Sequence, residues 1–217
     1  VVNWLINNLG QVGGYFGVHA LLSLGAILAA TVLSVPLARL AVASRRFGGL
    51  LLGAFSLLYA VPSLPMLVVI PVILGVPVRS PLNMVIVLTL YGISVLVTQV
   101  AEGFRSLPED VVEAANALGV DPWRRFWHVE LPLAVPVLIA GLRVVAASTV
   151  SLVTVGALVG VQSLGTLFTD GFQRQLVESL LTGLGATLLL ALIFDLLVVL
   201  LGRALTPWLR KQKQVAV

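Results

Sequence analysis

The chain has 217 residues, of which 59% are hydrophobic and only 10% are charged, and its mean hydropathy is +1.09. Soluble domains carry about 25% charged residues, so this composition excludes an ordinary soluble domain and indicates an integral membrane protein. The absence of cysteine excludes disulfides, thiol catalysis and cysteine-based metal sites, and His19 and His128 are too far apart to suggest a metal site. The net charge of +4 comes from basic residues beside apolar runs, where membrane topology needs them, so we expect no nucleic-acid partner.

Five apolar stretches are each long enough to cross a membrane, which takes about 20 residues. They lie at about residues 18–43, 50–74, 82–101, 131–160 and 177–201. The second stretch contains Pro62, Pro65 and Pro71 and is expected to be kinked or broken. The sequence therefore predicts an all-α integral membrane protein, a single transmembrane domain over residues 1–217 with five helices and no soluble domain.

Lysine and arginine are distributed unevenly between the two sides of these spans. The stretches after the first, third and fifth spans contain Arg39, Arg45, Arg46, Arg105, Arg124, Arg125, Arg203, Arg210, Lys211 and Lys213. The opposite side has only Arg79 and Arg174. Because basic residues favour the cytoplasmic side, we expect the N-terminus outside, the C-terminus in the cytoplasm, and the segment 102–130 in the cytoplasm as well.

The segment 102–130 is a charged, amphipathic interruption between the third and fourth spans. Pro108, Glu109 and Asp110 predict a helix start, and Gly119 predicts its end. Asp121 and Pro122 predict a second start, with Asp as the N-cap and Pro at the first helical position. We therefore expect a two-helix loop that protrudes from the membrane. The alternative is an ordinary solvated loop whose aromatic residues lie at the lipid interface.

Within this loop, Glu113-Ala114-Ala115 is followed after three residues by Gly119, and after nine more by Val129, one residue and Leu131-Pro132. This spacing resembles the "EAA loop" of type I ABC importer permeases. The resemblance implies that the loop couples the chain to a separate ATPase. The implied coupling residues are Glu113, Ala114, Ala115, Gly119, Asp121, Leu131 and Pro132. The small Ala114-Ala115 pair would permit close approach of the partner, and Glu113 could pair with a basic residue on it.

The same resemblance defines the expected partners and location. The chain contains no phosphate-binding G-x-x-x-x-G-K-[ST] motif, so it is expected not to be an enzyme, and ATP and Mg would bind to the partner. That partner is a pair of ABC ATPase subunits. A second permease subunit, identical or homologous, an extracytoplasmic substrate-binding protein and the lipid bilayer complete the set. The implied location is the cytoplasmic (inner) membrane of a bacterium or archaeon.

Shorter runs resemble the osmoprotectant branch of these permeases, which handles glycine betaine, carnitine and choline. They are the runs at residues 61–65, 130–136, 140–143 and 157–165. Pro65 and the Gln162-Ser163 pair depart from the pattern, and leave the substrate open. The alternatives are a permease for a different small solute such as an amino acid, or a proton-coupled secondary carrier that uses Asp195. A membrane scaffold without cargo is a further alternative.

Several polar residues lie inside the predicted spans. Tyr91, Ser94 and Thr98 share one helix face and could line a polar pathway, although Ser and Thr hydroxyls also bond back to their own helix. The candidate translocation path consists of Tyr59, Ser63, Tyr91, Ser94, Thr98 and Ser151. The two tyrosines could present aromatic faces to a quaternary ammonium group. Arg143 and Asp195 are isolated charges in apolar spans, which predicts that they pair with each other.

Overall fold

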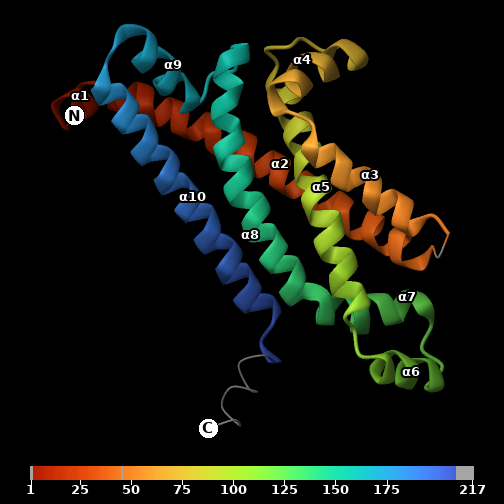
Figure 1. Ribbon diagram of the computed structural model, residues 1–217. Coiled ribbons are helices and arrows are strands. Elements are labelled where there is room, and N and C mark those ends of the chain that lie inside the picture. Colours follow the sequence, from red (N-terminus) through yellow and green to blue (C-terminus); the bar gives the residue numbers. More distant parts are fainter. Residues whose placement is uncertain (1, 45, 209–217) are drawn as a thin grey trace.

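The computed structural model describes residues 2–44 and 46–208, and every regular element in that part of the chain is helical (Figure 1). The basic residues Arg45, Arg210, Lys211 and Lys213 lie outside the described residues. The α-helices are α1 (Val2–Asn7), α2 (Leu9–Ala43), α3 (Gly48–Ala60), α4 (Ser63–Leu74), α5 (Pro81–Arg105), α6 (Glu109–Ala117), α7 (Pro122–Arg125), α8 (Leu131–Val155), α9 (Gly165–Arg174) and α10 (Val177–Leu205). A π-helical turn (Phe126–Glu130) joins α7 to α8, and a 3₁₀ turn (Gly156–Val159) follows α8.

Four stretches are each long and apolar enough to cross a membrane as one helix, and the bent pair α3–α4 gives a fifth candidate. The four are α2, α5, the continuous helix Pro122–Val159 and α10. This confirms the expected all-α membrane fold. The helices of the first, third and fifth predicted spans are longer than expected. Helix α2 begins at Leu9, α5 ends at Arg105 and α10 ends at Leu205.

The second predicted span is broken rather than straight. Between α3 and α4 the chain turns by 112° at Val61 and Pro62. Pro62 cannot donate a backbone hydrogen bond, and a residue that precedes proline avoids the helical conformation. Val61 accordingly adopts extended backbone angles, φ −70° and ψ 130°. The 13 residues of α3 span about 20 Å at the usual helical rise, less than the roughly 30 Å hydrocarbon core.

Helix α5 is the centre of the protein. In the most apolar 18-residue segment of α5, 67% of the residues are buried, whereas in the corresponding segment of α10 only 17% are. The difference arises because α2, α3, α4 and α8 all pack on α5. At Gly92 a β-carbon would lie 2.6 Å from the Ala30 β-carbon of α2 and 3.2 Å from a methyl group of Val145 on α8. The lack of a side chain at Gly92 therefore lets three helices meet closely.

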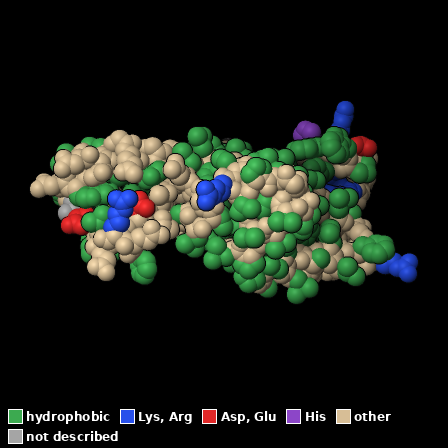
Figure 2. Space-filling model, turned by 90° about the horizontal axis from the view of Figure 1, so that it is seen from above, with side chains coloured by type: hydrophobic (Ala, Val, Ile, Leu, Met, Phe, Trp, Pro, Cys, Tyr) green, Lys and Arg blue, Asp and Glu red, His purple; other side chains and the backbone are tan. Residues whose placement is uncertain are grey.

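The two ends of the molecule differ in character. The N-terminus, α4 and α9 lie at one end, whereas α6, α7 and the end of α10 lie at the other (Figure 1). Seen from the first end, hydrophobic side chains cover much of the surface, and charged ones are few (Figure 2). On α4, Val72 and Ile73 are 75% and 70% exposed. Arg105 and Arg203 lie in the last turns of α5 and α10, at the second end.

Candidate functional site

Helix α6 carries the Glu113-Ala114-Ala115 motif on the surface of the molecule. Glu109 and Asp110 lie in its first turn, where the positive end of the helix dipole favours acids. Ala115 is its only buried residue, while Glu113 and Ala114 are exposed. The motif therefore presents one acidic and one small side chain outward, and rests on the body of the protein through a second small side chain.

Gly119 ends α6 in the left-handed conformation, with φ +71°. The Val120 amide donates to the Ala115 carbonyl at 3.1 Å, and the Gly119 amide donates to the Asn116 carbonyl at 2.9 Å. These two bonds form a Schellman motif, which satisfies carbonyls left free at the helix end. A β-carbon at Gly119 would meet nothing within 4 Å, so conformation rather than space favours glycine here.

Asp121 starts the next helix as the sequence predicted. Its Oδ2 accepts hydrogen bonds from the Trp123 amide at 3.0 Å and the Arg124 amide at 3.4 Å. Helix α7 does not end before the fourth span, however. It runs through the π-helical turn directly into α8, so of the two loop helices only α6 stands apart from the spans.

Leu131 and Pro132 lie where the π-helical turn becomes α8. The Leu131 amide donates to the Phe126 carbonyl five residues back, as in a π-helix. Pro132 has no amide hydrogen to offer the His128 carbonyl four residues back, and its ring would clash with that carbonyl. The proline thus accounts for the widened turn that precedes it.

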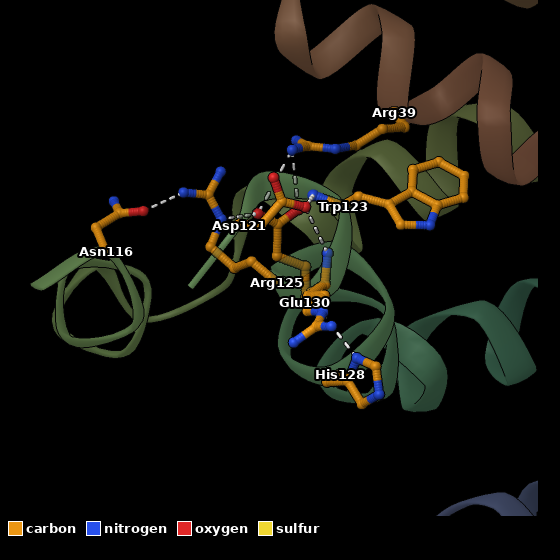
Figure 3. A network of polar contacts seen from close by, with 8 residues as sticks. Arg39, Asn116, Asp121, Trp123, Arg125, His128 and Glu130 are labelled. Carbon is orange, nitrogen blue, oxygen red and sulfur yellow. Dashed lines mark hydrogen bonds and ion pairs between the residues drawn. The ribbon is translucent and has the colours of Figure 1, made fainter. Parts of the chain in front are cut away.

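Glu130 connects this region to the first long helix, and the sequence analysis did not single it out. Its side chain is 5% exposed and pairs with Arg125 at 2.8 Å and with Arg39 of α2 at 3.2 Å. Arg125 also donates to the side-chain oxygen of Asn116 on α6 (Figure 3). The Arg39 guanidinium lies 5.8 Å from the centre of the Phe126 ring, a cation–π distance. The only hint in the sequence was an acid within an aromatic and basic segment.

The break between α3 and α4 lies beside an open cavity of about 640 Å³. Tyr59, Ser63, Tyr91 and Ser151 from the predicted path line it, together with Ala60, Val61, Pro62, Ala147, Ser148 and Leu152. The Tyr91 hydroxyl donates to the Val61 carbonyl, which the broken helix leaves available. The Tyr59 and Tyr91 rings meet edge to face, with centroids 6.4 Å apart and planes at 76°.

Ser94 and Thr98 line a neighbouring hollow of about 290 Å³ instead, which also contains Tyr59 and Ser56. Their hydroxyls bond back to their own helix, to the carbonyls of Tyr91 at 2.6 Å and Val95 at 2.8 Å. Both hydroxyls therefore bond back to their own helix and also line the hollow. Six predicted path residues thus divide between two adjoining hollows.

Arg143 on α8 and Asp195 on α10 form the ion pair that the sequence suggested. The Arg143 Nε and Nη2 atoms donate to the two Asp195 carboxylate oxygens at 2.6 and 2.9 Å. Both side chains are partly exposed, at 49% and 38%. Within the described residues, no cluster of three or more His, Cys, Asp or Glu side chains could hold a metal ion.

Comparison with known proteins assigns this chain to a family. Residues 18–211 match the model of the family described as "Binding-protein-dependent transport system inner membrane component". The chain belongs to this family. Its role is therefore that of a permease in an ABC importer, which confirms the family and the permease function that the resemblance implied.

Individual relatives agree with this assignment. The glycine betaine/carnitine/choline transport system permease protein OpuCD of Bacillus subtilis (strain 168) is 30% identical over 94% of this chain and 89% of its own length. The osmoprotectant import permease protein OsmY of Salmonella typhimurium (strain LT2) is 32% identical over 76% of this chain and 69% of its own length. The MetNI methionine ABC transporter in an inward-facing conformation has a chain of the same fold, with a TM-score of 0.80 and 18% identity over 92% of this chain and 98% of that one.

Proposed function

We propose that this permease moves small quaternary-ammonium or zwitterionic osmoprotectants of the glycine betaine, carnitine and choline type. Two independent observations support the cargo class. The relatives named above carry osmoprotectant or glycine betaine, carnitine and choline in their names. The cavity at the α3–α4 break combines two tyrosine rings with serine hydroxyls. An aromatic face attracts a quaternary ammonium group, and a hydroxyl can donate to a carboxylate.

In this proposal the Tyr59–Tyr91 cavity is part of the translocation path, and the hollow at Ser94 and Thr98 continues it. The cavity is open on the surface of the single chain. A second permease subunit, identical or homologous, would cover it and close the path. A polar hollow in lipid would be costly, whereas one between two subunits can be filled with water.

Coupling to ATP is assigned to α6. ATP and Mg bind to separate ABC ATPase subunits, and this chain performs no catalysis. The observation that carries this proposal is that Glu113 and Ala114 are exposed at the end of the molecule, on a helix that ends at Gly119. An ATPase can approach closely over Ala114 and can pair a basic residue with Glu113.

The orientation follows from the same arrangement. The α6 end carries most of the basic residues, so it faces the cytoplasm of a bacterial or archaeal inner membrane. The N-terminus then lies outside, where an extracytoplasmic binding protein delivers the cargo. The C-terminus lies inside.

The test of the cargo is uptake into proteoliposomes that contain the permease, its ATPase and its binding protein. Radiolabelled glycine betaine, choline and carnitine should accumulate, whereas methionine should not. Accumulation of methionine without the quaternary ammonium compounds would refute the cargo assignment.

Tyr91 tests the path within the same assay. Tyr91→Ala should lower the maximal uptake rate by about tenfold, the effect of losing one cation–π contact of roughly 1–2 kcal/mol. The apparent affinity should change little, because the binding protein supplies it. Tyr91→Phe keeps the ring but loses the bond to Val61, and so separates the aromatic contribution from the structural one. If both variants transport like the parent, Tyr91 does not line the path.

A further inference from the structure

We propose that Glu130 and its two arginine partners form the link that carries movement of α6 into the spans, and in particular into α2 and α3. This inference rests on the proposed coupling role of α6. It adds residues outside the Glu113–Gly119 motif and gives them a role in transmission rather than in docking.

Apart from its chain connections, α6 is weakly attached to the rest of the molecule. Ala115 is the only residue of α6 that is buried. Beyond the chain connections, the specific polar bond from α6 to the body is the one that Arg125 donates to Asn116. Apart from the chain connections to α5 and α7, a force applied to the exposed side of α6 therefore reaches the spans through Ala115 and Arg125.

Glu130 forms a junction between Arg125 and Arg39. This carboxylate is the only Asp, Glu, Lys or Arg side chain among the buried residues of the described chain. It holds Arg125 at 2.8 Å and Arg39 at 3.2 Å, and these arginines come from the start of the fourth span and from the end of α2 (Figure 3). Without its negative charge, two guanidinium groups would face each other, and like charges at short range repel. Glu130 thus holds Arg39 of α2, which lies 91 residues earlier in the sequence, beside the helix that carries Arg125.

Helix α2 is connected to the cavity through α3. Arg39 lies one turn before the end of α2. The following turn is tight, because the Gly48 amide donates to the Ser44 carbonyl at 2.9 Å. A β-carbon at Gly48 would lie 1.9 Å from the Ala41 carbonyl oxygen, so α2 and α3 are packed backbone to backbone at this point. Helix α3 then ends at Ala60, beside Tyr59 and Val61 in the cavity wall.

These contacts form a continuous route from the ATPase-facing helix to the proposed path. The π-helical turn that carries Glu130 lies within it, and π-helical turns inside helices are frequent at functional sites. The route predicts that α6 and the end of α2 move as one unit during the ATP cycle.

The test uses the complete importer in proteoliposomes and measures cargo transported per ATP hydrolysed. Glu130→Gln should preserve stimulation of the ATPase, because the exposed face of α6 is unchanged. It should lower cargo per ATP by about fivefold or more, the lower end of coupling effects between sites. Arg39→Gln, which breaks only the α2 half of the junction, should give the same phenotype. Glu102→Gln is the matched control, since Glu102 is an exposed acid near the end of α5.

A second readout follows the movement itself. The chain contains no cysteine, so single cysteines at Ala43 and Ala117 accept spin labels without background. Both positions are exposed, at the end of α2 and the end of α6. In the parent the distance distribution between the labels should stay narrow when ATP binds, and in Glu130→Gln it should broaden.

The outcomes distinguish a failure of the proposed function from a failure of the link at Glu130. A parent permease that does not stimulate its ATPase contradicts the proposed function itself. A parent that does, with Glu130→Gln and Arg39→Gln matching Glu102→Gln in cargo per ATP, overturns the link. Parallel loss of ATPase stimulation and uptake in both variants would also overturn it, because Glu130 would then only hold α6 in place for docking. If Glu130→Gln does not reach the membrane, Arg39→Gln decides alone.

Discussion

Single residues determine where α6 begins and ends. Gly119 is left-handed and faces open space, so its backbone angle, not its size, matters. A residue with a β-carbon costs about 1–2 kcal/mol in this conformation, whereas Asn tolerates it better than most. The Schellman motif at Gly119 would therefore survive Asn and be lost with a β-branched residue.

We expect Gly119→Val to abolish cargo uptake while the permease still inserts into the membrane. Valine would shift the end of α6 and the direction of the chain toward Asp121. Uptake by cells and the amount of permease in isolated membranes measure the two effects. Gly119→Asn is the control and should retain most of the uptake. Normal transport by the valine variant would show that the end of α6 is unimportant for coupling.

The Arg143–Asp195 pair gives a second prediction at this scale. Removal of one charge leaves the other unpaired within the spans, which is unfavourable in a membrane. Asp195→Asn should therefore lower the thermal stability of the purified permease more than the double variant Arg143→Gln/Asp195→Asn. Thermal unfolding in detergent or nanodiscs compares them. If the double variant had the lower thermal stability of the two, the ion pair would stabilise the fold by more than the cost of leaving a single charge unpaired.

Two kinds of feature could be predicted from the sequence, namely local helix ends and lone charges in apolar spans. The Gly119 helix end and the Asp121 cap follow from local backbone chemistry, and the structure has both. The Arg143–Asp195 pair followed from the cost of lone charges in apolar spans. The Glu130 junction could not be predicted, because Arg39 reaches it only through the packing of α2 on the fourth span, and no sequence rule sets that contact.

The elements are arranged around α5, and α2, α5 and α8 meet closely at Gly92. Most of the span prediction was confirmed at this scale, because long apolar runs leave little choice in a membrane. The bend between α3 and α4 was foreseen only as a kink or break. Its angle and the direction of α4 depend on tertiary contacts, such as the bonds from the Asn83 side chain to the carbonyls of Leu67 and Val78.

Gly92→Leu should destabilise the junction of α2, α5 and α8. A β-carbon alone would lie 2.6 Å from the Ala30 β-carbon, so a larger side chain forces the helices apart. Overpacking of a well-packed core costs about 1–3 kcal/mol or more. The melting temperature of the purified permease measures the effect. Gly53→Leu on α3, where a β-carbon would meet nothing within 4 Å, should leave it nearly unchanged. Equal effects of the two substitutions would contradict the packing argument.

The whole molecule has two different ends, and the proposed orientation predicts which reagents reach each end. A cysteine at Ser106, beside α6, should react only with membrane-permeant thiol reagents in intact cells. A cysteine at Ser80, between α4 and α5, should react with impermeant reagents as well. The parent chain has no cysteine of its own, so the labelling has no background. Reversed labelling would place α6 outside the cell and refute its coupling role.

In the function proposed above, this permease converts ATP hydrolysis by a partner into transport. The most direct measurement is ATP hydrolysis and glycine betaine uptake by the same proteoliposomes, with the ATPase and the binding protein present. We predict that the binding protein loaded with cargo raises hydrolysis, that uptake requires ATP, and that Gly119→Val loses uptake. Uptake that proceeds without the ATPase and follows an imposed proton gradient would contradict the account.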